Sequence, residues 1–221
     1  MKKNRLRLLS VLVTSALMTA CGGGKSDSSS STILNFLEST NVASTGFPWN
    51  GQFAGVDKRW TLPIPVKING ETRAGPAMDA LEAKLGYVIF DRTSIASVDD
   101  SQITRGVVFS KGTSYLPTGA DPKQYCGNVS GAPYSGGYPS NFLKTPGEIS
   151  TRLYVNLDNP QCVASADVTI HELGHAMGLG THFQGFGNPD AISQDFYTVL
   201  ATLYANPIGT PKASIMFKQA N

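Results

Sequence analysis

The chain of 221 residues has few charged side chains and no basic block outside its first residues. Only 15% of its residues are Asp, Glu, Lys or Arg, and four of the 18 basic ones lie within residues 1–20, where no acidic residue occurs. Subtracting those four leaves 14 basic against 16 acidic residues. Because phosphate backbones are bound by concentrated Lys and Arg, nucleic acid is excluded as the main partner. Heptads, internal repeats and a series of long apolar runs are also lacking, which excludes coiled coils and polytopic membrane folds.

What is present is the composition of a loop-rich globular protein, with 41% hydrophobic residues, 23 Gly and 13 Pro. The length is that of one sizeable domain. We divide the chain into a signal segment over 1–20, a Ser- and Gly-rich linker grading into the domain edge over 21–59, and one folded domain over 60–221.

The signal segment consists of a basic start followed by an apolar run from Leu8 to Leu17, which is too short to span a bilayer as a stable helix. Small residues then precede Cys21, and a Gly- and Ser-rich stretch follows it. This pattern resembles a bacterial lipoprotein signal. The resemblance implies cleavage before Cys21, a lipid on its sulfur and a location in the cell envelope, at the outer membrane or cell surface.

The two remaining cysteines, Cys126 and Cys162, lie in a chain expected to reach an oxidising compartment. A disulfide between them is the simplest interpretation, and two buried free thiols are the alternative. Neither cysteine belongs to a CxxC pair, so redox catalysis is not expected.

Hydrophobic periodicity along the rest of the chain predicts an α+β domain. One helix is expected from Gly75–Pro76 to Gly86, and a second helical pattern runs from Ile192 to Tyr204. Residues 110–148 are rich in Gly, Pro and Tyr and predict a long irregular segment. Strands are predicted over Trp60–Ile68, Tyr87–Phe90, Val107–Phe109 and Ile149–Leu157.

The chemistry is concentrated in a third predicted helix, over 168–178, which follows the N-cap candidate Ser165. His171 and His175 are four residues apart and therefore lie on one helix face, where both imidazoles can reach one zinc ion. Glu172 is rotated by about 100° from His171, which suits a general base acting on a zinc-activated water. The glycines after the helix allow a turn that would bring His182 to the metal as third ligand.

The segment His171–Leu179 resembles the metzincin clan of zinc metallopeptidases, and most of all its matrixin branch. Ser214–Ile215–Met216 is similar to the clan's Met-turn, in which the methionine forms an apolar floor beneath the metal. The resemblance implies a zincin fold: a twisted mixed sheet with an antiparallel, substrate-binding edge strand, packed on two main helices. Ile149–Leu157 stands where the clan has its edge strand. His182 comes one residue later than the clan's third histidine, and Asp190 or Asp195 is the alternative ligand.

The resemblance implies a zinc-dependent endopeptidase that uses one catalytic zinc ion and Glu172 as general base. Its expected partner is a protein or peptide substrate, and we expect a monomer. The alternative is a surface-anchored binding or adhesion lipoprotein with a structural or catalytically silent zinc site. Asp and Asn side chains in the long loop are potential calcium ligands, but no motif supports a calcium site.

Overall fold

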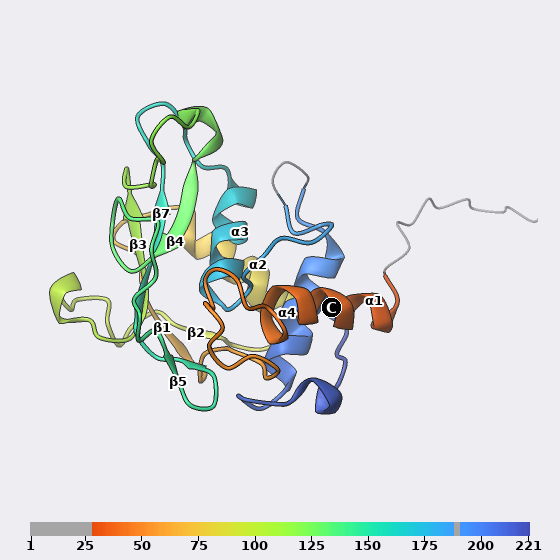
Figure 1. The fold of residues 1–221 in the computed structure, drawn as a ribbon. Helices are drawn as coiled ribbons and strands as arrows, with labels where there is room; N and C mark the ends of the chain where they lie inside the picture. Colours follow the sequence, from red (N-terminus) through yellow and green to blue (C-terminus); the bar gives the residue numbers. More distant parts are fainter. Residues whose placement is uncertain (1–27, 188–190) are drawn as a thin grey trace, which may run out of the picture.

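A computed structural model describes residues 28–187 and 191–221 of the chain (Figure 1). It is an α+β fold around a mixed five-stranded sheet with the strand order β2-β1-β3-β7-β4. The first four strands of this order are parallel, and β4 pairs with β7 in the antiparallel sense. The strands are β1 (Ile64–Lys67), β2 (Phe90–Asp91), β3 (Gly106–Lys111), β4 (Gly127–Ser130) and β7 (Arg152–Leu157); β5 (Leu143–Lys144) and β6 (Glu148–Ile149) form a separate hairpin.

Four α-helices complete the described part of the chain: α1 (Ser30–Leu37), α2 (Ala74–Leu85), α3 (Ala166–Ala176) and α4 (Gln194–Ala205). Helix α3 packs on β4 and β7, α2 packs on α3, and α4 lies between α2 and α1 (Figure 1). A π-helix spans Glu38–Val42, and short 3-10 helices span Asp100–Gln102, Pro122–Gln124 and Lys212–Ser214. The fold class, the helices around residues 75–86 and 192–204, and the helix after Ser165 are as the sequence predicts.

The N-terminal boundary of the domain differs from the prediction. Residues 28–59 are part of the fold, because α1 and the π-helix that follows place Ile33, Leu37 and Val42 in the main hydrophobic core with no exposed surface. Trp49 is also buried there, at 1% exposure. The linker assignment therefore extends too far toward Trp60. Because the sequence around α1 is rich in Ser and Thr, its composition does not indicate a helix. The short amphipathic helix α1 is stabilised by packing against α4.

The edge strand also differs from the prediction. Strand β7, which the resemblance placed at the sheet edge, is an inner strand between β3 and β4, and its residues from Leu153 to Leu157 are all buried. The antiparallel edge strand is β4, which lies inside the segment predicted to be irregular. Strand β4 is only four residues long and begins with Gly127 and Asn128, so it carries little of the apolar alternation by which strands are recognised.

Cys126 and Cys162 form the predicted disulfide, with their Cα atoms 5.1 Å apart. It joins the residue before β4 to the connection that leads from β7 to α3. The bond closes a loop with a sequence separation of 36, which corresponds to a stabilisation of about 4 kcal/mol through the unfolded state.

We expect the double replacement Cys126→Ser and Cys162→Ser to lower the free energy of unfolding by about 3–4 kcal/mol, because it removes this loop closure. Urea denaturation of the variant and of the oxidised wild type measures the difference. Reduction of the wild type with a thiol reagent should lower the free energy by the same amount. Equal midpoints for all three samples would contradict a stabilising role.

The predicted signal over 1–20 and the lipidation site Cys21 lie outside the described residues. Within residues 28–187 and 191–221, no helix combines the length and the apolar character needed to span a bilayer.

Candidate metal centre

Helix α3 positions three of the predicted site residues, and its ends are set by local sequence. The Ser165 hydroxyl accepts a hydrogen bond from the Val168 N–H at 3.1 Å, which caps the N-terminus. Asp167 in the first turn carries a charge that the helix dipole favours. After the C-cap residue Met177, Gly178 adopts a φ of +117°, which side chains with a Cβ rarely adopt. The chain therefore leaves the helix here and turns back across it.

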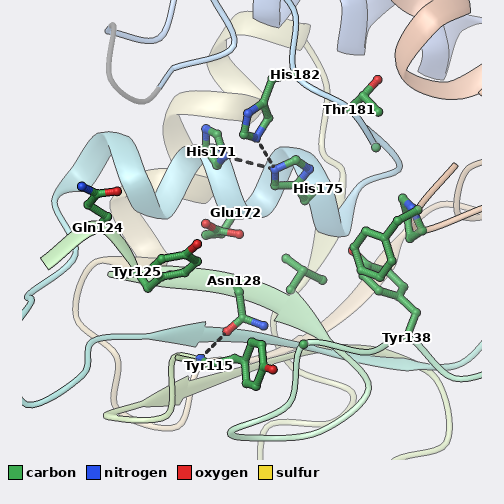
Figure 2. A pocket seen from close by; sticks show the side chains of 16 residues that line it. Tyr115, Gln124, Tyr125, Asn128, Tyr138, His171, Glu172, His175, Thr181 and His182 are labelled. Carbon is green, nitrogen blue, oxygen red and sulfur yellow. Dashed lines mark hydrogen bonds between the residues drawn. The ribbon is translucent and has the colours of Figure 1, made fainter. Parts of the chain in front are cut away.

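The three histidines of the chain meet beside this turn, as the sequence predicts (Figure 2). His175 Nε2 lies 3.1 Å from His171 Nε2 and 3.1 Å from His182 Nε2. The ligand atoms of all three lie within 4.8 Å of one another. His171 is buried, His175 is half-buried and His182 is exposed to the cleft, so the cluster has a closed side and an open side.

Burial keeps these imidazoles neutral, and a backbone hydrogen bond leaves Nε2 of His175 free as a metal ligand. His175 Nδ1 lies 2.7 Å from the Leu179 carbonyl oxygen, so Nδ1 holds the proton and Nε2 is free to act as a ligand. Burial lowers the pKa of His171 to about 2 and that of His175 to about 4, and it also lowers the pKa of His182. Neutral imidazoles are the form that binds metal, and a set of three with one open side fits a divalent transition-metal ion.

The apolar floor of the cluster is Phe186 and not Met216. The Phe186 ring is fully buried, and its centroid lies 4.8 Å from those of His171 and His175 and 5.0 Å from that of His182. Met216 is 65% exposed, and its backbone is held by two hydrogen bonds with the Asn206 side chain. The Met-turn assignment is thus corrected, because a tripeptide match does not fix where the methionine side chain points.

Of the two acidic residues predicted as alternatives to His182, only Asp195 lies among the described residues, and it is not part of the histidine cluster. The Asp195 carboxylate, at the start of α4, accepts hydrogen bonds from the Ser28 hydroxyl at 2.6 Å and the Ser28 N–H at 3.2 Å. It is absent from the group of ligand atoms that the histidines form. Asp190 lies outside the described residues. His182 is thus the third member of the cluster despite its one-residue shift.

Glu172 lies on the same helix but points away from the histidine rings, toward the start of β4 (Figure 2). The residue is 6% exposed, and burial raises the pKa of its carboxyl to about 8. A Cβ atom on Gly127 would come within 2.8 Å of Glu172 Cγ and 3.0 Å of its Oε1. Glycine at the first position of β4 is therefore what lets the edge strand approach this carboxyl. A cation bound by the histidines would lower the pKa of Glu172, because opposite charge favours the carboxylate.

The histidines and Glu172 form part of the wall of one cleft of about 720 Å³. Strand β4 contributes Gly127, Asn128 and Val129 to another wall. Aromatic residues lie toward both ends: Tyr115 and Tyr125 lie near Asn128, and Tyr138 lies away from them, beyond His175 (Figure 2). Phe47, which also lines the cleft, packs edge-on against Tyr138 with ring centroids 5.2 Å apart. The sequence did not predict Phe47, which belongs to the supposed linker, or Tyr138 as residues of the site. The only signal for either is an aromatic side chain in a Gly- and Pro-rich segment.

Comparison of the chain with protein-family models, with curated proteins and with solved structures finds no match. The geometry by itself defines the class of site: a cluster of three histidines able to hold a metal ion, with a carboxyl beside it in an open cleft.

Proposed function

We propose that this protein is a zinc-dependent endopeptidase with a metzincin-like catalytic domain. The observation that carries the proposal is the convergence of His171, His175 and His182 in a cleft whose wall also contains Glu172. Imidazole ligands suit zinc as well as copper, iron and nickel, and three protein ligands with one open position are typical of catalytic zinc sites. A structural zinc site has no need of a carboxyl held beside it.

The proposed reaction is hydrolysis of a peptide bond. His171, His175 and His182 would hold a zinc ion, and such an ion would act as a Lewis acid toward a water molecule and the scissile carbonyl. Glu172 accepts a proton from the attacking water as its oxygen bonds to the carbonyl carbon. Glu172 then delivers that proton to the amide nitrogen as the C–N bond breaks, so a free carboxyl end and a free amine are released.

Strand β4 supports an extended polypeptide as the substrate. It is one of the two edge strands of the sheet, and its residues 127–129 line the cleft next to Glu172. The backbone groups of an edge strand can pair with an added strand, so a bound peptide would lie along β4 with its scissile bond near the histidines. This arrangement gives an endopeptidase the backbone contacts that hold a chain in the middle of its length.

The side chains around the cleft favour uncharged substrate residues next to the scissile bond. Among the described residues that line it, Glu172 is the sole carboxylate, and no Lys or Arg is present. The cleft is also lined by the apolar or aromatic side chains of Phe47, Val129 and Tyr138. We therefore expect cleavage beside apolar or aromatic residues, because an ionised side chain would lose hydration there without gaining a partner.

Replacing Gly127 with alanine tests the placement of Glu172. The added Cβ would overlap Glu172 Cγ, so we expect kcat to fall at least tenfold while zinc stoichiometry stays at one per chain. A suitable control is Gly137→Ala, because a Cβ atom there meets nothing closer than the Ser135 hydroxyl at 3.8 Å. Full activity of the Gly127 variant would show that β4 does not constrain Glu172.

We also propose that the mature protein is anchored in the cell envelope by lipid on Cys21. Because the folded domain includes Ser28, the connection to the anchor is at most about 25 Å long when fully extended, at about 3.5 Å per residue. Substrates would then be met close to the membrane surface. In fractionated cells, Cys21→Ser should move most of the protein from the membrane fraction to the soluble fraction. Equal distribution of variant and wild type would contradict the anchor.

A further inference from the structure

The loop that carries His182 is hydrogen-bonded to the N-terminal segment rather than to the sheet. The Gly180 N–H donates to the Thr40 carbonyl oxygen at 2.9 Å, and the Thr40 hydroxyl donates to the Thr181 carbonyl oxygen at 2.6 Å. The Thr181 hydroxyl in turn donates to the Ser39 carbonyl oxygen at 3.0 Å. Three hydrogen bonds therefore join two consecutive residues of the segment to the two residues just before His182.

The contacts continue on both sides of this bonded pair. Asn41 Nδ2 donates to the Gly178 carbonyl oxygen at 2.6 Å, where the loop begins. Phe183, the residue after His182, stacks on Phe36 of α1 with ring centroids 4.8 Å apart. The loop is thus held by the N-terminal segment before, at and after the position of His182.

Burial makes Thr40 the central residue of these contacts. Thr40 and Asn41 have no exposed surface, and the Thr40 carbonyl oxygen also accepts a hydrogen bond from Trp49 Nε1 at 3.0 Å. A Cβ atom on Gly180 would lie 2.7 Å from both Thr40 O and Trp49 Nε1, so the loop backbone packs directly on this pair. The Thr40 hydroxyl has its hydrogen-bond partner in the loop and is not left to solvent.

We propose that Thr40 is a positioning residue of the metal centre: its hydrogen bonds to the loop fix His182 in register with the two helical histidines. This inference rests on the proposed function, since it assumes that the three histidines bind zinc. A loop with two glycines and one extra residue has many conformations, and holding it at Gly180 and Thr181 selects one before the metal binds. Metal affinity then reflects a site that is already assembled.

The test is the zinc affinity of the full chain, measured by competition with a chromophoric chelator. Thr40→Val keeps the shape of the side chain and removes the hydroxyl, and we expect it to weaken zinc binding about tenfold, at the low end of the range for residues that orient ligands. Thr40→Ser restores the hydroxyl and should restore most of the affinity. Thermal unfolding of the metal-free proteins reports how much stability each change costs.

Thr202→Val is the matched control. Thr202 is also fully buried, and its hydroxyl donates to a backbone carbonyl, that of Lys218 at 3.0 Å, which is not part of the His182 loop. We expect this variant to lose stability without losing zinc affinity. If Thr40 had a purely structural role, Thr40→Val would likewise lower stability without weakening zinc binding.

The zinc affinities of the wild type and of Thr40→Val distinguish a failure of the Thr40 role from a failure of the proposed zinc site. Zinc binding by the wild type with an unchanged affinity in Thr40→Val would overturn the role of Thr40 alone. A wild type that does not bind zinc would overturn the metal site and this role with it. If Thr40→Val does not fold, Thr181→Val removes the neighbouring hydrogen bond, from the exposed Thr181 hydroxyl to the Ser39 carbonyl oxygen. An unchanged zinc affinity there would overturn the inference that hydrogen bonds to the N-terminal segment position His182.

Discussion

Replacing Glu172 with glutamine is expected to lower kcat/KM for peptide hydrolysis by about 10²- to 10⁴-fold while leaving one zinc ion bound per chain. Glutamine has nearly the same shape, so the packing against Gly127 is kept, but it cannot accept the proton of the attacking water. Proton transfer by a positioned carboxylate contributes about 10²- to 10⁴-fold to such reactions, and no other carboxylate among the described residues lines the cleft.

Steady-state cleavage of a fluorogenic peptide and metal analysis of the same samples measure both quantities. Asp167→Asn is the control, because Asp167 lies in the first turn of the same helix and takes no part in the cleft. It should retain the activity of the wild type. A Glu172→Gln variant with more than a tenth of the wild-type activity would contradict the role of Glu172 as general base.

The second large effect is expected from His182→Ala, which should weaken zinc binding by about 10²- to 10³-fold. A closed four-ligand zinc site supplies about 10–16 kcal/mol of apparent binding energy, so one ligand accounts for several kcal/mol. His182 Nε2 lies 3.1 Å from His175 Nε2, and within residues 28–187 and 191–221 no Asp or Glu belongs to the group of ligand atoms around it. Water would have to take the vacated position.

Chelator competition at constant pH measures the affinities of the wild type and of the variant. Asp195→Asn serves as the control, since the structure places this carboxylate against Ser28 rather than among the ligand atoms, and its zinc affinity should equal that of the wild type. An unchanged affinity in His182→Ala would mean that a different residue completes the site. A loss in Asp195→Asn would identify Asp195 as that residue.

The helical half of the site was predictable from the sequence because it depends on local geometry. Two histidines four residues apart on a helix share one face in any fold, so the positions of His171 and His175 follow from their spacing. Ser165 and Gly178 mark the two ends of the helix. The approach of His182 was also predictable, because a glycine just after the helix lets the chain turn back toward the two helical histidines.

The rest of the site depends on contacts between distant segments, which local patterns do not contain. Strand β4 is too short and too polar to be recognised, and its pairing with β7 is what places Gly127 against Glu172. The N-terminal segment has a linker-like composition, yet Thr40 contacts a loop 141 residues further along the chain. Phe186 replaces Met216 beneath the histidines because the packing of the turn after His182 decides which apolar side chain reaches them.

The most direct test of the central claim is the appearance of new chain ends in a mixture of denatured proteins incubated with the zinc-loaded protein. We expect internal cleavage, mapped by mass spectrometry of new amino termini, that stops when zinc is removed by a chelator and returns when zinc is added back. Cut sites should lie beside apolar or aromatic residues. A folded protein that holds one zinc ion and leaves the mixture intact would contradict the account and favour a binding role for the cleft.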